Sequence, residues 1–164
     1  MKLPLLFPAL AAIILVATLS TAHAETHNAP NADDEKQINT LLTNYTTSVT
    51  NGDSALFESQ LLDLHIPFSG VSQKKGGAAK MTLQSIQNYQ GFKAAIFGDS
   101  QQYKQRFSAI DIQQVGNLAQ VSLDYETAGQ GEDYQGKGWK IIQLIKVDGN
   151  WKIASEFFAG YPRS

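Results

Sequence analysis

Cysteine is absent from all 164 residues of the sequence, and histidine occurs only three times. The absence of cysteine excludes disulfides, thiolate metal sites, cysteine nucleophiles and lipid chains attached to cysteine. Excess positive charge is also missing, because 13 basic and 15 acidic side chains leave a formal net charge of −2. Proteins that bind nucleic acids by electrostatic attraction need a positive surface, so we expect no nucleic-acid partner.

What the sequence does contain is typical of one globular domain. Hydrophobic residues make up 43% of the chain and charged residues 17%, an ordinary composition for a globular fold. A domain of this size buries roughly two-thirds of the surface of its unfolded chain, which is enough for a core without disulfides. The lack of cysteine is therefore compatible with an oxidising compartment.

The N-terminus has the three parts of a secretory signal peptide. Lys2 provides a positive start, an apolar run follows over residues 3–19, and Ala22-His23-Ala24 suits signal peptidase. The alternative is an uncleaved membrane anchor, but Pro4 and Pro8 shorten the apolar helix below the roughly 20 residues that a span needs. We therefore predict a signal peptide over residues 1–24, a periplasmic or secreted protein, and no stable membrane insertion after processing.

A polar tether is predicted over residues 25–32, one domain over residues 33–160, and a tail over residues 161–164. Helical spacing begins after Asp33, because apolar residues recur at steps of three and four. These residues are Ile38, Leu41, Leu42, Tyr45 and Val49. Gly52 suits the end of this helix.

Two shorter helices are predicted after the first. Asp53 suits the cap of the second helix, which ends near Pro67 because the residue before a proline avoids helical angles. Thr82 is the predicted cap of a third helix that runs through Tyr89. Gly91 is predicted to break it, and residues 91–105 are predicted as a loop with one helical turn at most.

The last third of the chain alternates apolar and polar residues, which is typical of strands. Gly116-Asn117 and Asp148-Gly149 are the predicted hairpin turns, and residues 129–138 are predicted as a glycine-rich loop. The predicted strands cover residues 68–71, 107–115, 119–126, 139–147 and 151–158. Three helices followed by an antiparallel sheet indicate an α+β domain.

Several segments resemble nuclear transport factor two-like proteins, a group that includes SnoaL-like cyclases and ketosteroid isomerases. The matching segments are Asn44-Tyr45, Val49-Thr50-Asn51-Gly52-Asp53, Leu64-His65-x-Pro67, Met81-Thr82, Gly138-Trp139-Lys140-Ile141-Ile142-Gln143-Leu144 and Asp148-Gly149-Asn150-Trp151-Lys152-Ile153-Ala154-Ser155. The resemblance covers most of residues 34–158. It implies three N-terminal helices packed in a curved antiparallel sheet, an α+β cone that encloses a pocket.

Three residues are predicted as catalytic if the pocket carries out chemistry. Tyr45 precedes Asp53 by eight residues, the spacing of the oxyanion-hole tyrosine in the ketosteroid isomerases that the chain resembles. His65 is the predicted general base, because histidine titrates near neutrality, and Asp124 is the alternative base. The carboxylate base that the isomerases carry after the second helix is missing from residues 67–70. Structural roles are the alternative for all three: a core tyrosine, a helix-end histidine and a solvated carboxylate.

Large aromatic and amide side chains are the predicted walls of the pocket. Gln143 falls in phase with apolar neighbours, so its amide requires a partner if it is buried; an outward position is the alternative. The predicted ligand-binding residues are Tyr89, Tyr103, Tyr125, Trp139, Gln143 and Phe157, beside Tyr45. No metal site and no cofactor are predicted.

These observations favour an exported protein that binds a small apolar molecule. One alternative is a SnoaL-like isomerase, cyclase or dehydratase that acts on an apolar carbonyl compound. A second alternative is an interaction module that forms a homodimer through its sheet, because Trp139 and Trp151 lie on strands whose second face the helices leave uncovered.

Overall fold

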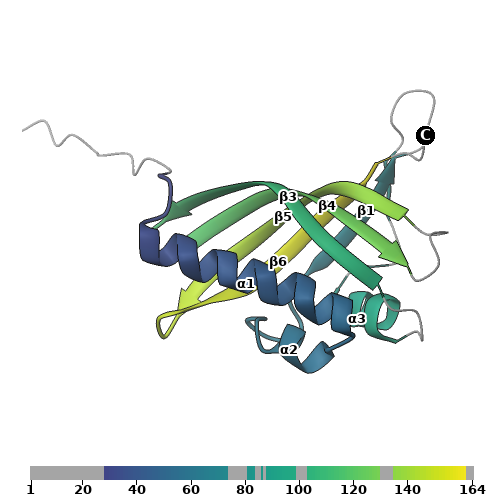
Figure 1. The fold of residues 1–164 in the computed structure, drawn as a ribbon, viewed down its shortest axis with the longest axis horizontal. Helices are drawn as coiled ribbons and strands as arrows, with labels where there is room; N and C mark the ends of the chain where they lie inside the picture. The colour runs from purple at the N-terminus through teal and green to yellow at the C-terminus, as the bar shows by residue number, and fades with distance from the viewer. Residues whose placement is uncertain are drawn as a thin grey trace, which may run out of the picture.

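A computed structural model describes residues 28–73, 81–83, 86, 88–98, 103–129 and 135–161 of the chain. In this part of the chain a curved sheet wraps around three helices, which all lie on its concave side (Figure 1). The predicted signal peptide and residues 25–27 of the predicted tether lie outside the described residues. No helix in the described ranges is long and apolar enough to cross a membrane.

Helix α1 (Ala32–Asn51) lies along the inner face of the sheet. It begins at Asn31, whose side chain accepts hydrogen bonds from the backbone N–H groups of Asp33 and Asp34, and it ends at Gly52 with φ 69°. A left-handed residue at this position favours glycine. The start and end of this helix agree with the prediction, and its apolar stripe faces the core.

Helices α2 (Ser54–Glu58) and α3 (Tyr89–Phe97) lie near the C-terminal end of α1. A third helix is present, but its predicted start is wrong, because Met81–Leu83 forms a strand and the helix begins only at Tyr89. Gly91 does not break α3, since it sits in the first turn and its N–H donates to the Asn88 side chain. The side-chain cap satisfies an N–H that has no partner within the helix.

In the described ranges, six strands form one mixed sheet in the order β2-β1-β6-β5-β4-β3. They are β1 (Phe68–Gln73), β2 (Met81–Leu83), β3 (Tyr103–Val115), β4 (Leu118–Gly129), β5 (Gln135–Val147) and β6 (Asn150–Gly160). The neighbouring strands are antiparallel except for β1 and β6, which are parallel with Phe68 opposite Glu156. The α+β class is confirmed, but the sheet is not wholly antiparallel and α3 follows its first two strands.

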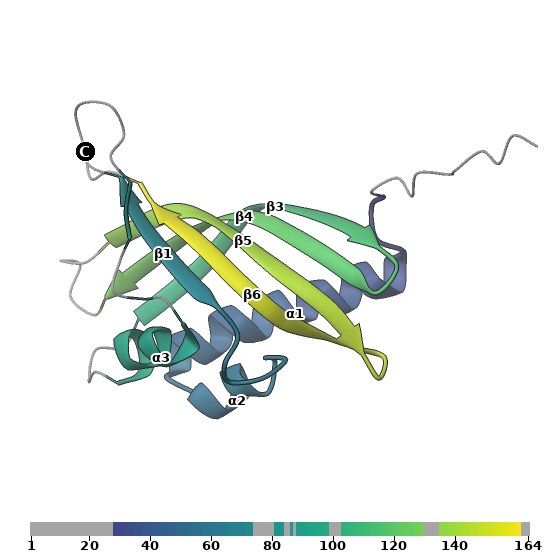
Figure 2. The same cartoon turned by 180° about the vertical axis from the view of Figure 1, so that it is seen from behind.

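The long strands are bent rather than straight (Figure 2). The register of β3 against β4 shifts between Ser108 and Asp111, and Ala109 in this bulge has φ 48°. A second shift lies between β5 and β6 after Gln143. Because bulges bend strands and increase their twist, these two irregularities curve the sheet over α1.

The predicted glycine-rich loop is also shorter than expected, because β4 continues to Gly129 and β5 begins at Gln135. Gly138 lies within β5 for a steric reason. A Cβ at this position would stand 2.1 Å from the Ala159 carbonyl oxygen and 2.7 Å from the Tyr125 ring. Glycine therefore permits the tyrosine ring to lie against the backbone of β5.

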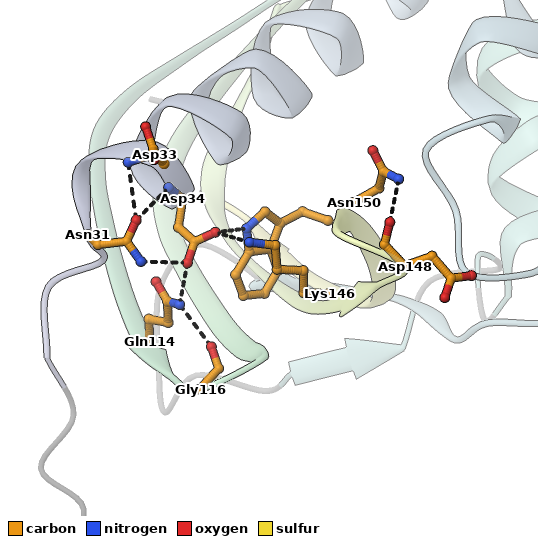
Figure 3. Close-up of polar contacts among 9 residues, drawn as sticks. Asn31, Asp33, Asp34, Gln114, Gly116, Lys146, Asp148 and Asn150 are labelled. Atoms are coloured by element: carbon orange, nitrogen blue, oxygen red, sulfur yellow. Dashed lines mark hydrogen bonds and ion pairs between the residues drawn. The ribbon is translucent and has the colours of Figure 1, made fainter.

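Asp34 connects the first turn of α1 to the end of β3, the end of β5 and the start of β6 (Figure 3). Its carboxylate accepts hydrogen bonds from Lys146 Nζ at 2.6 Å, from Gln114 Nε2 and Asn31 Nδ2 at 2.8 Å each, and from Trp151 Nε1 at 3.0 Å. The Lys146 ammonium and the other donors hold the pKa of this buried carboxyl far below its ordinary value. Trp151 consequently packs inward on the helix side of the sheet.

Candidate functional site

Three polar side chains from distant parts of the chain meet inside the core. Tyr45 comes from α1, Lys140 from β5 and Glu156 from β6; we call them the buried triad. Lys140 Nζ lies 2.7 Å from Glu156 Oε1 and 2.7 Å from Tyr45 Oη, and the Tyr45 hydroxyl donates to Glu156 Oε2 at 2.8 Å. Their exposed fractions are 0% for Tyr45 and 2% for each of the other two.

Backbone geometry explains why these side chains converge. Tyr45 lies on the apolar stripe of α1, which faces the sheet. Lys140 alternates along β5 with exposed Trp139 and lies in phase with fully buried Ile142. The register shift after Gln143 changes which residues of β6 point inward. Beyond this shift Glu156 lies on the inner face of the sheet, as Lys140 does.

Burial changes the protonation equilibria of this triad. Burial raises the pKa of the Tyr45 phenol well above its ordinary value, and the Glu156 carboxylate raises it further. Burial lowers the pKa of the Lys140 ammonium, while the Glu156 carboxylate opposes this effect. Removal of water disfavours the charged form of both groups, so that the neutral amine of lysine and the neutral phenol of tyrosine become relatively more stable.

Aromatic rings surround the Lys140 ammonium. Nζ lies 4.6 Å from the centroid of the Tyr45 ring, and four further rings lie between 5.3 and 5.9 Å. We call these four rings the aromatic shell: Phe92, Phe107, Tyr125 and Phe158. Ring faces attract a cation at such distances, so the shell replaces part of the stabilisation that water would give.

A cavity of about 540 Å³ opens at the ends of β3, β4 and β5, beside the last turn of α1. We call it the rim cavity. Gln105 and Thr127 form a buried pair in its wall, with Gln105 Nε2 donating to Thr127 Oγ1 at 3.1 Å. The Gln105 side-chain oxygen has no hydrogen-bond partner among the described residues.

The rim cavity and the aromatic shell are neighbours along the strands. Gln105 pairs with Thr127, and Phe107 pairs with Tyr125 two residues further along the same two strands. Two residues of a strand span about 7 Å. The polar pair therefore stands between the cavity and the rings that enclose Lys140.

Solved structures with this architecture are known. An NTF2-like protein of unknown function from Shewanella baltica matches with a TM-score of 0.56 and 20% identity, over 83% of this chain and 100% of that chain. A candidate scytalone dehydratase from Novosphingobium aromaticivorans matches with a TM-score of 0.60 and 15% identity, over 79% of this chain and 85% of that chain. An NTF2-like protein from Cytophaga hutchinsonii matches with a TM-score of 0.58 and 17% identity, over 80% of this chain and 99% of that chain. The chain has the NTF2-like fold. No protein-family model and no curated protein matches the sequence.

The NTF2-like fold separates the three residues predicted as catalytic. Tyr45 lies inside the cone, but the His65 side chain is 96% exposed in the loop after α2, with Asp63 as its neighbour. Asp124 lies on the outer face of the sheet and accepts a hydrogen bond from Tyr161. The three side chains do not converge, because strand alternation turns Asp124 away from the helices and His65 is exposed in a loop.

The predicted pocket walls divide between the two faces of the sheet. Tyr89 is buried in the core. Tyr103 and Tyr125 lie on the sheet, are partly buried and pack against this core. Trp139 and Phe157 are 37% and 39% exposed on the outer face. Gln143 is exposed there too, where its side chain bonds to Ser155. Trp139, Gln143 and Phe157 therefore do not line the interior of the NTF2-like cone, which corrects the prediction for these three.

Sequence reasoning missed Lys140 and Glu156. A signal for Lys140 exists, because it alternates with outward residues in the same phase as Ile142 and Leu144. Glu156 gives no comparable signal, since the register shift breaks its phase with Ile153. Within the described ranges, no group of three acidic or histidine side chains is arranged to hold a metal ion.

Proposed function

We propose that this chain is an exported protein that binds a small molecule inside the NTF2-like cone, with the buried triad as the polar contact. The observation that carries the proposal is the Lys140 ammonium, held between a carboxylate and a phenol inside an aromatic shell. Apolar rings and a few convergent polar groups are the usual composition of a small-molecule site.

Stability alone does not account for the triad. Removing an ammonium and a carboxylate from water costs several kcal/mol per ion, and well-packed apolar residues of similar volume often give an equal or more stable core. Ionisable groups whose pKa values are strongly shifted by burial cluster at functional sites. The Lys140–Glu156 pair therefore supports recognition of a polar group on a ligand.

The rim cavity supports a route to the triad. Its volume of about 540 Å³ lies within the range of small-molecule pockets, roughly 300–1,000 Å³. The free oxygen of the Gln105 amide would meet a donor on the entering molecule. An apolar body would then lie against Phe107 and Tyr125, with its polar group directed toward Lys140.

A paired substitution tests this proposal. Lys140→Met with Glu156→Leu removes both charges together, so neither is left buried without a partner. A panel of small aromatic carbonyl compounds, carboxylates and alcohols is screened by thermal shift against the wild type and the double variant. We expect at least one class to raise the Tm of the wild type and to leave the folded double variant unchanged. Equal shifts in both proteins would contradict binding at the triad.

Acid–base catalysis is the second candidate, favoured by the 2.7 Å contact between Lys140 Nζ and Tyr45 Oη. A buried phenol that donates to a developing enolate stabilises it. The test is hydrogen–deuterium exchange at the α-carbon of a ligand ketone, followed by NMR. Catalysis requires that Tyr45→Phe slows the exchange while ligand binding persists. Exchange at the rate of the buffer would overturn this candidate.

Export rests on the pattern of residues 1–24. The test is expression of the full chain in a Gram-negative bacterium, followed by cell fractionation and mass spectrometry of the intact protein. We expect periplasmic or secreted protein that begins at Glu25. A full-length protein in the membrane fraction would contradict the proposal.

Homodimer formation through the outer face of the sheet is proposed separately. Leu118, Trp139, Val147 and Phe157 are exposed apolar residues on this face, between 37% and 57% accessible. Exposed apolar side chains of this kind favour protein contacts. Sedimentation of the wild type and of Trp139→Glu tests it: a dimer that becomes a monomer supports the proposal, and a wild-type monomer contradicts it.

A further inference from the structure

We infer that Lys140 is a nucleophile that captures an aldehyde or ketone ligand as an imine. This inference rests on the proposed binding inside the cone and names the chemical class of the ligand. The geometry that carries it is a lysine nitrogen 2.7 Å from both a carboxylate oxygen and a phenolic oxygen, within a shell of aromatic rings.

Lys140 differs from the other inward lysine of the same strand. Lys146 also contacts a carboxylate, that of Asp34 at 2.6 Å, but its side chain is 23% exposed. The Lys140 side chain is 3% exposed, and the side chain of its partner Glu156 is fully buried. Desolvation in an apolar site is a recognised way of activating a lysine amine. Lys146 therefore provides an internal control on the same strand.

The two partners of Lys140 supply the proton transfers that imine formation needs. The ammonium gives one proton to Glu156, and the free electron pair on nitrogen attacks the carbonyl carbon. A C–N bond forms, the C=O π bond breaks, and the oxygen takes the proton back from Glu156. Glu156 next removes a proton from nitrogen and delivers it to the hydroxyl group, which leaves as water. The products are a protonated imine and one water molecule, and no oxidant or reductant is involved.

Tyr45 positions the carboxylate for these steps. Its hydroxyl donates to Glu156 Oε2, while Lys140 faces Glu156 Oε1. One carboxylate oxygen is thus fixed by the phenol, and the other is left to exchange protons with nitrogen. Tyr45 is a positioning residue in this scheme, because it acts through Glu156.

Besides the route from the rim cavity, a second route to nitrogen would pass the one ring of the shell that belongs to neither the sheet nor α1. Phe92 lies on α3, and its ring centroid is 5.9 Å from Lys140 Nζ. Lys93 on the same helix is bound to Glu58 by a partly exposed ion pair of 2.6 Å. Movement of α3 would withdraw Phe92 without breaking a strand pair, and a small carbonyl compound could then approach the amine.

The experiment is reductive trapping with benzaldehyde on the wild-type protein. The folded protein is incubated near neutral pH with benzaldehyde and sodium cyanoborohydride, which reduces an imine to a stable benzylamine. Intact mass and peptide mapping then locate the benzyl group. Burial lowers the pKa of the Lys140 ammonium, which increases the share of neutral amine that can attack a carbonyl. We therefore expect Lys140 to be labelled faster than Lys146.

The outcomes separate the imine from simple binding. Benzyl alcohol, which cannot form an imine, is tested in parallel by thermal shift. Faster labelling of Lys140 supports the inference, and a lower labelling rate in Glu156→Gln supports the proton transfers. Labelling that favours Lys146 or exposed lysines overturns the imine, while a Tm increase with benzyl alcohol would leave the binding proposal intact. No Tm increase with any compound of the panel would count against the binding proposal itself.

Discussion

The carboxylate of Asp34 lies 2.6 Å from the ammonium of Lys146, although the two residues are 112 positions apart in the chain. Tyr45 and Lys140 form a second contact between the same helix and the same strand. The two contacts are about 17 Å apart along the helix at about 1.5 Å per residue. They are about 20 Å apart along the strand, so α1 is fixed to β5 at two well-separated points.

The Asp34 contact predicts a specific dependence of stability on pH. Its folded pKa is depressed by Lys146 and the other donors, so the carboxylate stabilises the fold fully above its unfolded pKa of about 3.9. This stabilisation is lost as the pH falls below that value toward the folded pKa. Asp34→Asn should reduce the free energy of unfolding at neutral pH by about 3 kcal/mol.

Urea denaturation between neutral pH and about pH 2 provides the measurement. The wild-type free energy of unfolding should fall more steeply than that of Asp34→Asn below about pH 4. Asp33→Asn is the control, because Asp33 is exposed on the same turn of α1. Parallel curves for the wild type and Asp34→Asn would show that the carboxylate does not hold this end of α1.

The buried triad predicts that replacing Glu156 alone destabilises the fold more than replacing Glu156 and Lys140 together. Glu156→Leu alone leaves the Lys140 ammonium buried without its carboxylate, which should cost about 3–5 kcal/mol. Adding Lys140→Met removes the unpaired charge and should restore most of the loss. Chemical denaturation of the wild type, of Glu156→Leu, of Lys140→Met and of the double variant gives the coupling free energy; additive effects would contradict a coupled pair.

Adding a side chain at Gly138, which takes no part in the proposed chemistry, should lower stability for steric reasons. In Gly138→Ala the new methyl group meets the Ala159 carbonyl and the Tyr125 ring, and overpacking of this kind costs about 1–3 kcal/mol or more. Gly116→Ala is the comparison, since nothing lies within 4 Å of its added Cβ and only its φ of 55° is unfavourable. Thermal denaturation should show the larger decrease in Tm for Gly138→Ala.

The exposed residues predict an absence of effect. His65→Ala and Asp124→Asn change side chains outside the cone, and surface substitutions usually alter stability by less than about 0.5 kcal/mol. Both variants should keep the wild-type Tm and the wild-type ligand-induced Tm increase. Loss of the ligand response in His65→Ala would restore this histidine as a participant in the site.

The sequence predicted well the elements whose signals are local. Strand alternation and the dipeptides Gly116-Asn117 and Asp148-Gly149 marked both hairpins, and Gly116, Asp148 and Gly149 indeed have positive φ values. The helix cap at Asn88 was missed, because a glycine three residues later obscured the start of α3.

The site was harder to predict than the fold, because it depends on contacts between distant segments. Tyr45 was singled out by its spacing to Asp53, and it does lie in the interior. Its partners Lys140 and Glu156 are 95 and 111 positions away. Their inward orientation follows from the register of β5 and β6. That register contains a shift, which the alternation of apolar and polar residues in the sequence does not reveal.

The parallel pairing of β1 with β6 sets an order on how this molecule can assemble. Strand β1 pairs with β2 on one side, but its partner on the other side is β6, the last strand of the described sheet, with Phe68 opposite Glu156. Contacts between such remote segments form slowly, since a long loop must close before they are made. The N-terminal half therefore cannot complete its sheet while the ribosome is still synthesising the final strand, and the nascent polypeptide remains open until its translation is almost finished.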